Sequence, residues 1–295
     1  MLKPFIEFRQ QRDFSSLLSD TFAFIRNEFK PFMKTVLSIA GPALAAFLIA
    51  MAFYTYTAGD MLDFDIHSDR SPFAFANPLL FIASTIAYAV AGIVAYVFAG
   101  SAALHYIKAY IDNNGTVEFQ EVRQDVMRTF WGFFGLSFLK WVTIGFGLLL
   151  CVLPVLYVMV PMTIVLCIYV FSERHGAMDA YSESFSLVNE DFWTVFGTVI
   201  VFVIILYILS FVFAIPAAIY SYAKMGVFSG EMDPANMNNF VDPVYIALNV
   251  ISTLFQFLLN LIIVVASAFI YFHLNEKRNY TGTLNRIEQI GNKEA

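Results

Sequence analysis

The residues of this chain that could carry acid–base or metal chemistry are few and far apart. The four histidines never lie four residues apart: His67, His105, His175 and His273. A helical His-x-x-x-His metal site is therefore not encoded. The nearest set of ionisable groups at the end of an apolar stretch is His105, Asp112 and Glu173, and their spacing does not indicate catalysis.

One acidic cluster has residue types that bind divalent cations. It comprises Asp63, Asp65, His67 and Asp69. The cluster lacks the glycine and glutamate spacing of a calcium-binding loop. We expect a solvated acidic loop here, and we predict no metal site and no cofactor.

Motifs typical of phosphoryl transfer, acyl transfer, zinc hydrolysis and dithiol exchange are missing from the sequence. GxxxxGK[ST], GxSxG, HExxH and CxxC do not occur. Cys151 and Cys167 lie inside apolar stretches, which is typical of small packing residues rather than of a disulfide or zinc site. We predict no catalytic residues and no enzyme activity.

A polar stripe follows the last apolar stretch of the chain, residues 244–272. Its members recur mainly at three-, four- or seven-residue steps: Asn249, Ser252, Thr253, Gln256, Asn260 and Ser267. Such residues share one face of a helix, and in hydrocarbon they need partners, so the stripe should face the bundle interior. Two interpretations stay open, hydrogen bonds between helices and the wall of a substrate or ion path.

Six apolar stretches must position these residues. They are residues 35–57, 79–104, 133–152, 155–172, 194–220 and 244–272. Each is long enough, or nearly so, to cross about 30 Å of hydrocarbon as a helix. Only 14% of the residues are charged, against about 25% in soluble domains. We predict an all-α polytopic membrane protein with six transmembrane helices and cytoplasmic amphipathic helices.

The third and fourth stretches are separated by a predicted turn. As one helix, residues 130–172 would be about 63 Å long, twice the hydrocarbon thickness. Pro154 cannot continue a helical hydrogen-bond ladder, so we place the turn at Cys151–Val155.

The basic residues predict the orientation of the chain. Six spans place 14 Lys and Arg residues on one side and only Arg70 and Lys224 on the other. Because Lys and Arg favour cytoplasmic loops, we predict a cytoplasmic (inner) membrane protein with both termini, including the tail 273–295, in the cytoplasm. The net charge of −6 and the lack of a dense basic patch exclude nucleic acid as an expected partner.

The first 34 residues form a predicted cytoplasmic amphipathic segment, followed by the transmembrane domain 35–272. Apolar residues recur there at helical spacing: Leu18, Phe22, Ile25, Phe29 and Phe32. The helix lies on the membrane surface, with Arg12, Arg26 and Lys30 at anionic headgroups, or it packs on the cytoplasmic end of the bundle. We expect Met1–Gln11 to be a loose lead.

Two further cytoplasmic amphipathic pieces are predicted. Asp112–Gly115 has the composition of a turn, and Thr116 is a plausible N-cap for a short helix after it. Residues 173–191 form the other piece, with an apolar side and an acidic side.

The second stretch carries an alanine at every fourth position. The row is Ala83, Ala87, Ala91, Ala95, Ala99 and Ala103. Small residues let helices approach closely, and a four-residue step winds by about 40° around the helix. We predict a central helix that packs on more than one neighbour, with self-association as the alternative.

Lys140 is the lone charge inside a predicted span, within about two turns of its cytoplasmic end. We expect its ammonium group to reach toward the headgroups. A buried functional lysine is the alternative.

Two cytoplasmic-side patches carry a family resemblance. They comprise Phe22, Ile25, Arg26, Phe29, Lys30 and Ile39–Pro42, and then Glu173, Ala180, Ser184, Phe185, Leu187, Val188, Phe192 and Trp193. With the six-span layout, they resemble uncharacterised six-span proteins common in Bacteroidota. They are more distantly similar to the membrane domain of some glycerophosphoryl diester phosphodiesterases. The resemblance implies an inner-membrane address and no established catalytic residues. The phosphodiesterase activity is not carried over, because that activity belongs to a soluble barrel domain that this sequence does not contain.

These patterns favour a non-enzymatic integral membrane protein that acts as an accessory or scaffold in a membrane complex or lipid process. The alternative is a small transporter or lipid-handling carrier that uses the polar stripe of residues 244–272. Membrane lipids are the expected partners, with other membrane proteins as further candidates.

Overall fold

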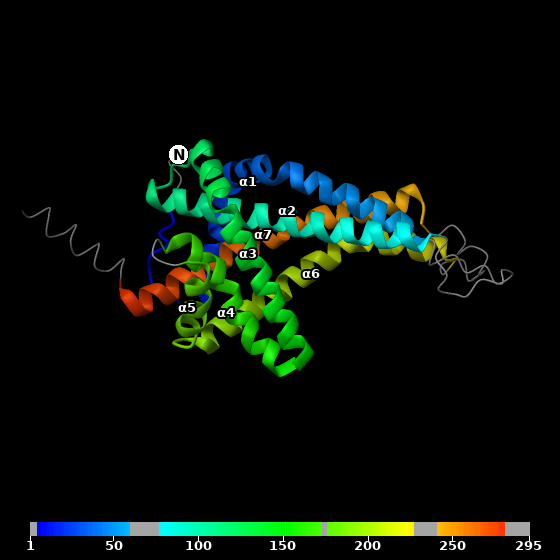
Figure 1. The fold of residues 1–295 in the computed structure, drawn as a ribbon. Coiled ribbons are helices and arrows are strands. Elements are labelled where there is room, and N and C mark those ends of the chain that lie inside the picture. Colours follow the sequence, from blue (N-terminus) through cyan, green and yellow to red (C-terminus); the bar gives the residue numbers. More distant parts are fainter. Residues whose placement is uncertain (1–4, 60–76, 151, 173–175, 227–240, 281–295) are drawn as a thin grey trace, which may run out of the picture. The chain divides into compact units, whose positions relative to one another are not determined.

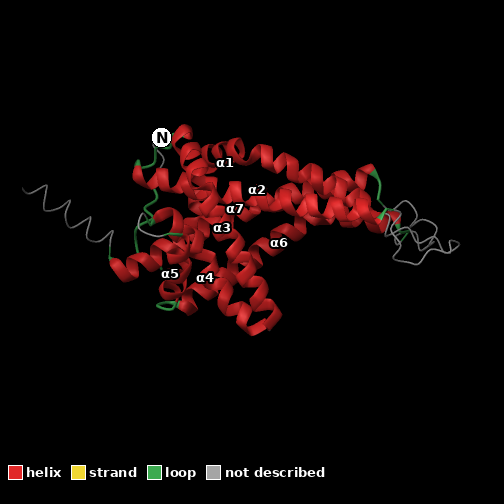
Figure 2. Ribbon diagram, in the orientation of Figure 1, coloured by secondary structure: helices red, strands yellow, loops and turns green. Residues whose placement is uncertain are grey.

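The computed structural model describes residues 5–59, 77–150, 152–172, 176–226 and 241–280 (Figure 1). Their regular structure is helical throughout (Figure 2). The helices are α1 (Phe14–Gly59), α2 (Pro78–Asp112), α3 (Phe119–Leu150), α4 (Val152–Phe171), α5 (Ala177–Val188), α6 (Phe192–Lys224) and α7 (Pro243–Asn279). All except α5 contain an apolar segment long enough to cross a membrane, which makes 6 candidate spans among the described residues. The predicted all-α, six-span fold is confirmed.

The break between the third and fourth spans lies where the sequence indicated. α3 ends at Leu150 and α4 begins at Val152. Pro154 then falls in the first turn of α4, where its missing N–H has no helical partner to lose.

Two predicted cytoplasmic helices are instead continuous with the spans that follow them. α1 has 46 residues and passes through residue 34 without a break, and α3 enters the third span from Phe119. At about 1.5 Å per residue, α1 follows a path of about 69 Å. α1 passes through Pro31, although a proline has no backbone N–H to donate to the helical ladder. Extending an existing helix is cheaper than nucleating a new one.

The predicted N-cap at Thr116 is wrong. Its hydroxyl donates to the Asn113 carbonyl at 2.8 Å, inside the preceding turn. The first helical bond of α3 runs from the Val122 N–H to the Glu118 carbonyl, which places the cap at Glu118. Thr116 instead stabilises the turn itself, a common local use of a short hydroxyl side chain.

Short polar side chains fix the starts of three other helices. Asp13, Asn77 and Asp242 each accept a hydrogen bond from the N–H three residues later, at 2.9, 3.1 and 2.8 Å respectively. Pro78 and Pro243 occupy the first helical position of α2 and α7, where a proline is favourable. These caps define where two of the spans begin after the chain segments 60–76 and 227–240.

The chain divides into two compact units. The first unit comprises residues 1–39, 97–204 and 261–295, and the second comprises residues 40–96 and 205–260. In the first unit α3, α4 and α5 pack against one another. Its core contains fully buried aromatic side chains, among them Phe8, Phe24, Phe32, Tyr106, Phe133 and Phe269. The second unit has an aromatic core of its own, in which Phe47 contacts both Tyr88 and Phe257.

The alanine row of α2 changes environment along its length. Ala83 and Ala87 are exposed, whereas Ala95, Ala99 and Ala103 are buried. The glycines beside the row face different helices. A Cβ on Gly92 would lie 3.0 Å from the Phe47 ring of α1, and one on Gly100 would lie 3.7 Å from Phe133 of α3.

Two glycines of α3 give a matched test of the α3–α4 packing. A Cβ on Gly132 would lie 2.0 Å from the Tyr169 hydroxyl oxygen, whereas a Cβ on Gly135 would meet nothing within 4 Å. We expect Gly132→Ala to destabilise the protein by about 1–3 kcal/mol, because the Tyr169 ring must move. Gly135→Ala should leave stability unchanged or raise it by up to about 1 kcal/mol. Thermal unfolding in detergent measures both.

Tyr169→Phe provides the control for this packing. In the Gly132→Ala background it removes the closest clashing atom and should restore part of the lost stability. Equal melting temperatures for the Gly132 and Gly135 variants would contradict the packing.

Candidate functional site at the N-terminal segment

The N-terminal segment, residues 5–13, is packed into the first unit, so the expectation of a loose lead is wrong over its described part. Phe8 is fully buried and stacks on Phe269 of α7 with ring centroids 4.2 Å apart. It also meets the edge of Phe24 of α1 at 5.2 Å. One large aromatic side chain in a core contributes several kcal/mol, which is enough to order a short segment.

The Arg12 side chain bonds to the backbone of this segment and to α1. Its side chain is only 1% exposed, and its Nε donates to the Asp20 carboxylate at 2.9 Å. The guanidinium carbon lies 4.7 Å from the Phe269 ring centroid. The remaining guanidinium donors bind three backbone carbonyls of the same segment: Glu7, Phe8 and Gln10. Burial lowers the pKa of Arg12 while Asp20 raises it, and an arginine stays charged throughout.

His273 of α7 links the segment to the start of α6. Its Nδ1 accepts the Arg12 backbone N–H at 3.0 Å, and its Nε2 lies 3.3 Å from the Asp191 carboxylate. Because an amide N–H can only donate, Nδ1 carries no proton, and the neutral ring donates from Nε2. Asp191 also accepts from Lys277 at 2.8 Å and from Thr194 at 2.7 Å. We call Arg12, Asp20, Asp191, His273 and Lys277 the N-terminal clamp.

The electrostatics of the clamp favour an ionised Asp191. Partial burial raises the pKa of this carboxyl, but hydrogen bonds from Lys277, Thr194 and His273 outweigh burial and hold the pKa below its usual value. The stabilisation from Asp191 is therefore present at neutral pH and is lost only as the pH falls through this lowered pKa.

The clamp has the residue types of a catalytic His–Asp pair but a different geometry. A general base needs a ring nitrogen free to face a substrate. Both nitrogens of His273 are engaged, one by the Arg12 amide and one by Asp191. The arrangement can hold three chain segments together, which is a structural role.

Both ring nitrogens of His105 also have hydrogen-bond partners. Its Nδ1 donates to the Ser101 carbonyl at 2.8 Å, and its Nε2 lies 3.2 Å from the Thr129 hydroxyl oxygen. It therefore ties α2 to α3. Of the two residues named with it from the sequence, Asp112 has a carboxylate oxygen 3.6 Å from the Arg9 guanidinium, and Glu173 falls outside the described residues.

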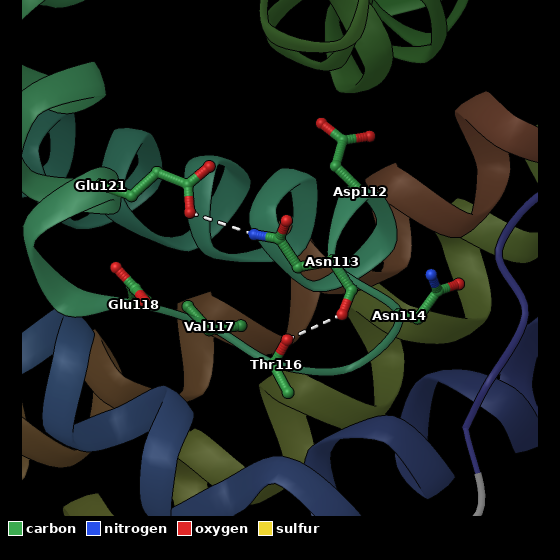
Figure 3. A pocket seen from close by; sticks show the side chains of 7 residues that line it. All are labelled: Asp112, Asn113, Asn114, Thr116, Val117, Glu118 and Glu121. Carbon is green, nitrogen blue, oxygen red and sulfur yellow. Dashed lines mark hydrogen bonds between the residues drawn. The ribbon is translucent and has the colours of Figure 1, made fainter.

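An open hollow of about 500 Å³ lies at the turn between α2 and α3 (Figure 3). Asn114 and Gly115 have positive φ angles there, of 50° and 94°, which confirms the predicted turn. Asn113 donates to Glu121 at 3.0 Å. Among the described residues, no three His, Cys, Asp or Glu side chains gather closely enough to hold a metal ion. The hollow is lined by residues of this hydrogen-bonded turn and of the start of α3.

The polar stripe of the sixth span makes its described hydrogen bonds mostly within α7. Asn249 donates to the Tyr245 carbonyl at 2.9 Å, and Asn260 donates to the Gln256 carbonyl at 2.8 Å. Gln256 donates to the Ser252 hydroxyl at 3.1 Å. Ser252 is buried, Asn260 is exposed, and Asn249, Thr253 and Gln256 are half-buried.

One further stripe residue does reach another helix. Ser267 lies 3.2 Å from the Cys167 sulfur of α4, within the first unit. Lys140 of α3 is half-buried. Both interpretations of the stripe, and both of Lys140, stay predictions.

The acidic cluster and several other residues named from the sequence fall outside the described part of the chain. They are Asp63, Asp65, His67, Asp69, Cys151, Glu173 and His175. The expectation that Arg12 lies at anionic headgroups is wrong, because its side chain is buried and paired with Asp20. The sequence did not show that the clamp residues meet, because 261 positions separate Arg12 from His273 and no local pattern links them.

Comparison of this chain with protein-family models, with curated proteins and with solved structures gave no match. The family resemblance expected from the two cytoplasmic-side patches stays a prediction.

Substitution of His273 tests the clamp. His273→Ala leaves the buried Arg12 N–H without its acceptor, at a cost of about 1–3 kcal/mol. Exchange of the Arg12 amide should accelerate roughly 5- to 150-fold, as measured by hydrogen–deuterium exchange of the N-terminal peptide. His273→Asn keeps an acceptor near the Nδ1 position and should show a much smaller effect. Equal acceleration in both variants would argue against the hydrogen bond as the cause.

Proposed function

We propose that this chain is a non-enzymatic multi-pass protein of the cytoplasmic (inner) membrane that acts as a scaffold or accessory subunit in a membrane complex or lipid process. The carrying observation is the N-terminal clamp. It uses charged side chains and a histidine to fix the N-terminal segment, α1, α7 and the start of α6 in one body. Such internal bonds order the surrounding surface before a partner binds. An ordered surface favours recognition, because less entropy is lost on binding.

A surface suited to a protein partner lies on the first part of α3. Phe119, Arg123, Met127 and Trp131 are exposed at four-residue spacing, and Met127 and Trp131 are 52% and 79% exposed. The adjoining face of the same helix, about 100° around its axis, is buried through Val122 and Val126. We call these four exposed residues the α3 stripe.

The orientation part of the proposal rests on the positive-inside rule and can be tested by labelling. Single cysteines at Asp65 and Asn236, in a Cys151→Ala/Cys167→Ala background, should react with a membrane-impermeant maleimide on cells whose outer barrier has been removed. A cysteine at Lys293 should react only after the inner membrane is permeabilised. The reverse pattern would refute cytoplasmic termini.

Partner recovery tests the scaffold function. Deleting residues 1–30 is a poor test, because it removes the core residues Phe8 and Phe24. Phe119→Ser with Met127→Ser instead changes exposed side chains, and it should lower recovery of co-purifying membrane proteins at least tenfold if they are binding hot spots. Quantitative mass spectrometry after mild-detergent purification measures this, and an unchanged protein profile would count against the proposal.

The transporter alternative predicts normal recovery of partners when the polar stripe of α7 is changed. It is favoured by the exposed amide of Asn260 on a membrane-length helix. Gln256→Leu with Asn260→Leu serves as the matched variant, since the described bonds of these residues lie within α7. Loss of the cellular phenotype in this folded variant, with normal recovery of partners, would favour transport over scaffolding.

A further inference from the structure

Three basic residues form a line along α1. Arg26, Lys30 and Lys34 lie four positions apart, and all three are exposed. Residues at this spacing are neighbours on one helix face, and the line covers about 12 Å of the helix. We call it the basic line of α1.

The described ion pairs do not neutralise this line. Like charges four residues apart destabilise a helix by about 0.2–0.5 kcal/mol per pair, so an anionic partner is favoured. The nearest acids on α1 are used elsewhere. Glu28 is buried and accepts a hydrogen bond from the Tyr106 hydroxyl at 3.0 Å, while Asp20 is held by Arg12 at 2.9 Å. None of the described ion pairs includes Arg26, Lys30 or Lys34.

Apolar side chains accompany the basic line. Phe29 and Phe22 are 53% and 38% exposed. An open hollow of about 590 Å³ is lined by Arg26 together with Ser19, Asp20, Phe22, Ala23 and Ile25. Aromatic rings next to basic groups are typical of the boundary between headgroups and acyl chains.

The position of the line along the chain identifies the source of the anion. Lys34 directly precedes the apolar stretch 35–57, and α1 continues from one into the other without a break. A charge at this point lies at headgroup level when the following helix crosses the bilayer. We propose that the basic line of α1 binds the phosphate headgroup of an anionic phospholipid, with Phe29 inserted at the interface.

This inference rests on the proposed membrane placement and names the lipid that the scaffold recognises. A soluble phosphate would not require the exposed Phe29, and an acidic protein segment would not require the line to end at the membrane boundary. Both remain distinguishable outcomes of the experiment below.

The test compares two variants of the full chain that lose the same charge. Lys30→Gln/Lys34→Gln removes two members of the line. Arg128→Gln/Arg278→Gln removes two exposed basic residues outside α1, which are already paired with Asp125 at 2.8 Å and with Glu190 at 3.4 Å respectively. Native mass spectrometry of the detergent-purified proteins measures the binding of added phosphatidylglycerol, with phosphatidylcholine as the neutral reference.

We expect the α1 variant to bind phosphatidylglycerol about 25-fold more weakly than the wild type, because each basic residue near an anionic surface contributes roughly a fivefold factor. Phosphatidylcholine binding should not change, and the Arg128/Arg278 variant should stay close to the wild type. Lys30→Arg/Lys34→Arg should restore binding, and added salt should weaken it in the wild type.

Equal behaviour of the two double variants would overturn the inference. So would displacement of the lipid by millimolar inorganic phosphate, which would identify a soluble anion, or loss of a co-purifying acidic protein without any change in lipid binding. If the α1 variant does not fold, wild-type lipid binding that is insensitive to salt overturns it instead. Partner recovery through the α3 stripe is measured separately, so failure of the lipid inference leaves the scaffold proposal standing.

Discussion

The buried guanidinium of Arg12 is the interaction on which the first unit depends. A charge removed from water is costly unless its hydrogen-bond donors are matched. Here Asp20, three carbonyls of the same segment and the face of Phe269 supply the match. The backbone N–H of the same residue is matched by His273. Order in the N-terminal segment and order at the end of α7 are therefore parts of one hydrogen-bonded arrangement.

The same constraint governs the other ionisable groups of the first unit. Asp191 is surrounded by Lys277, Thr194 and His273, and Glu28 pairs with Tyr106. Asp191 and Glu28 are therefore committed to partners that hold helices together. The basic line of α1 and the α3 stripe differ, since they present side chains outward. This division between an internally matched polar core and two outward surfaces supports a binding function.

Continuity of the long helices changes how the cytoplasmic segments should be understood. α1 and α3 both begin in the first unit and continue without interruption into apolar segments of membrane length. A partner bound to the α3 stripe or a lipid bound to the basic line would therefore contact a helix that continues into a membrane-length segment. Of the apolar face predicted from the sequence, only Phe32 is fully buried, whereas Phe22 and Phe29 are exposed. The buried face of α1 also contains Leu17, Thr21 and Phe24.

The sequence alone determined the six-span all-α fold, the break before Pro154 and the turn at Asp112–Gly115, because hydrophobic length, proline and glycine act locally along the chain. It could not show that α1 and α3 run unbroken. The helical periodicity is the same on both sides of residue 34, so it does not distinguish one long helix from two consecutive helices. The polar stripe and the alanine row were visible as patterns, but their surroundings were not. Only the tertiary structure decided that Arg12, Asp191 and His273 meet, because contacts between such distant positions follow from how the helices pack and leave no periodic trace in the sequence.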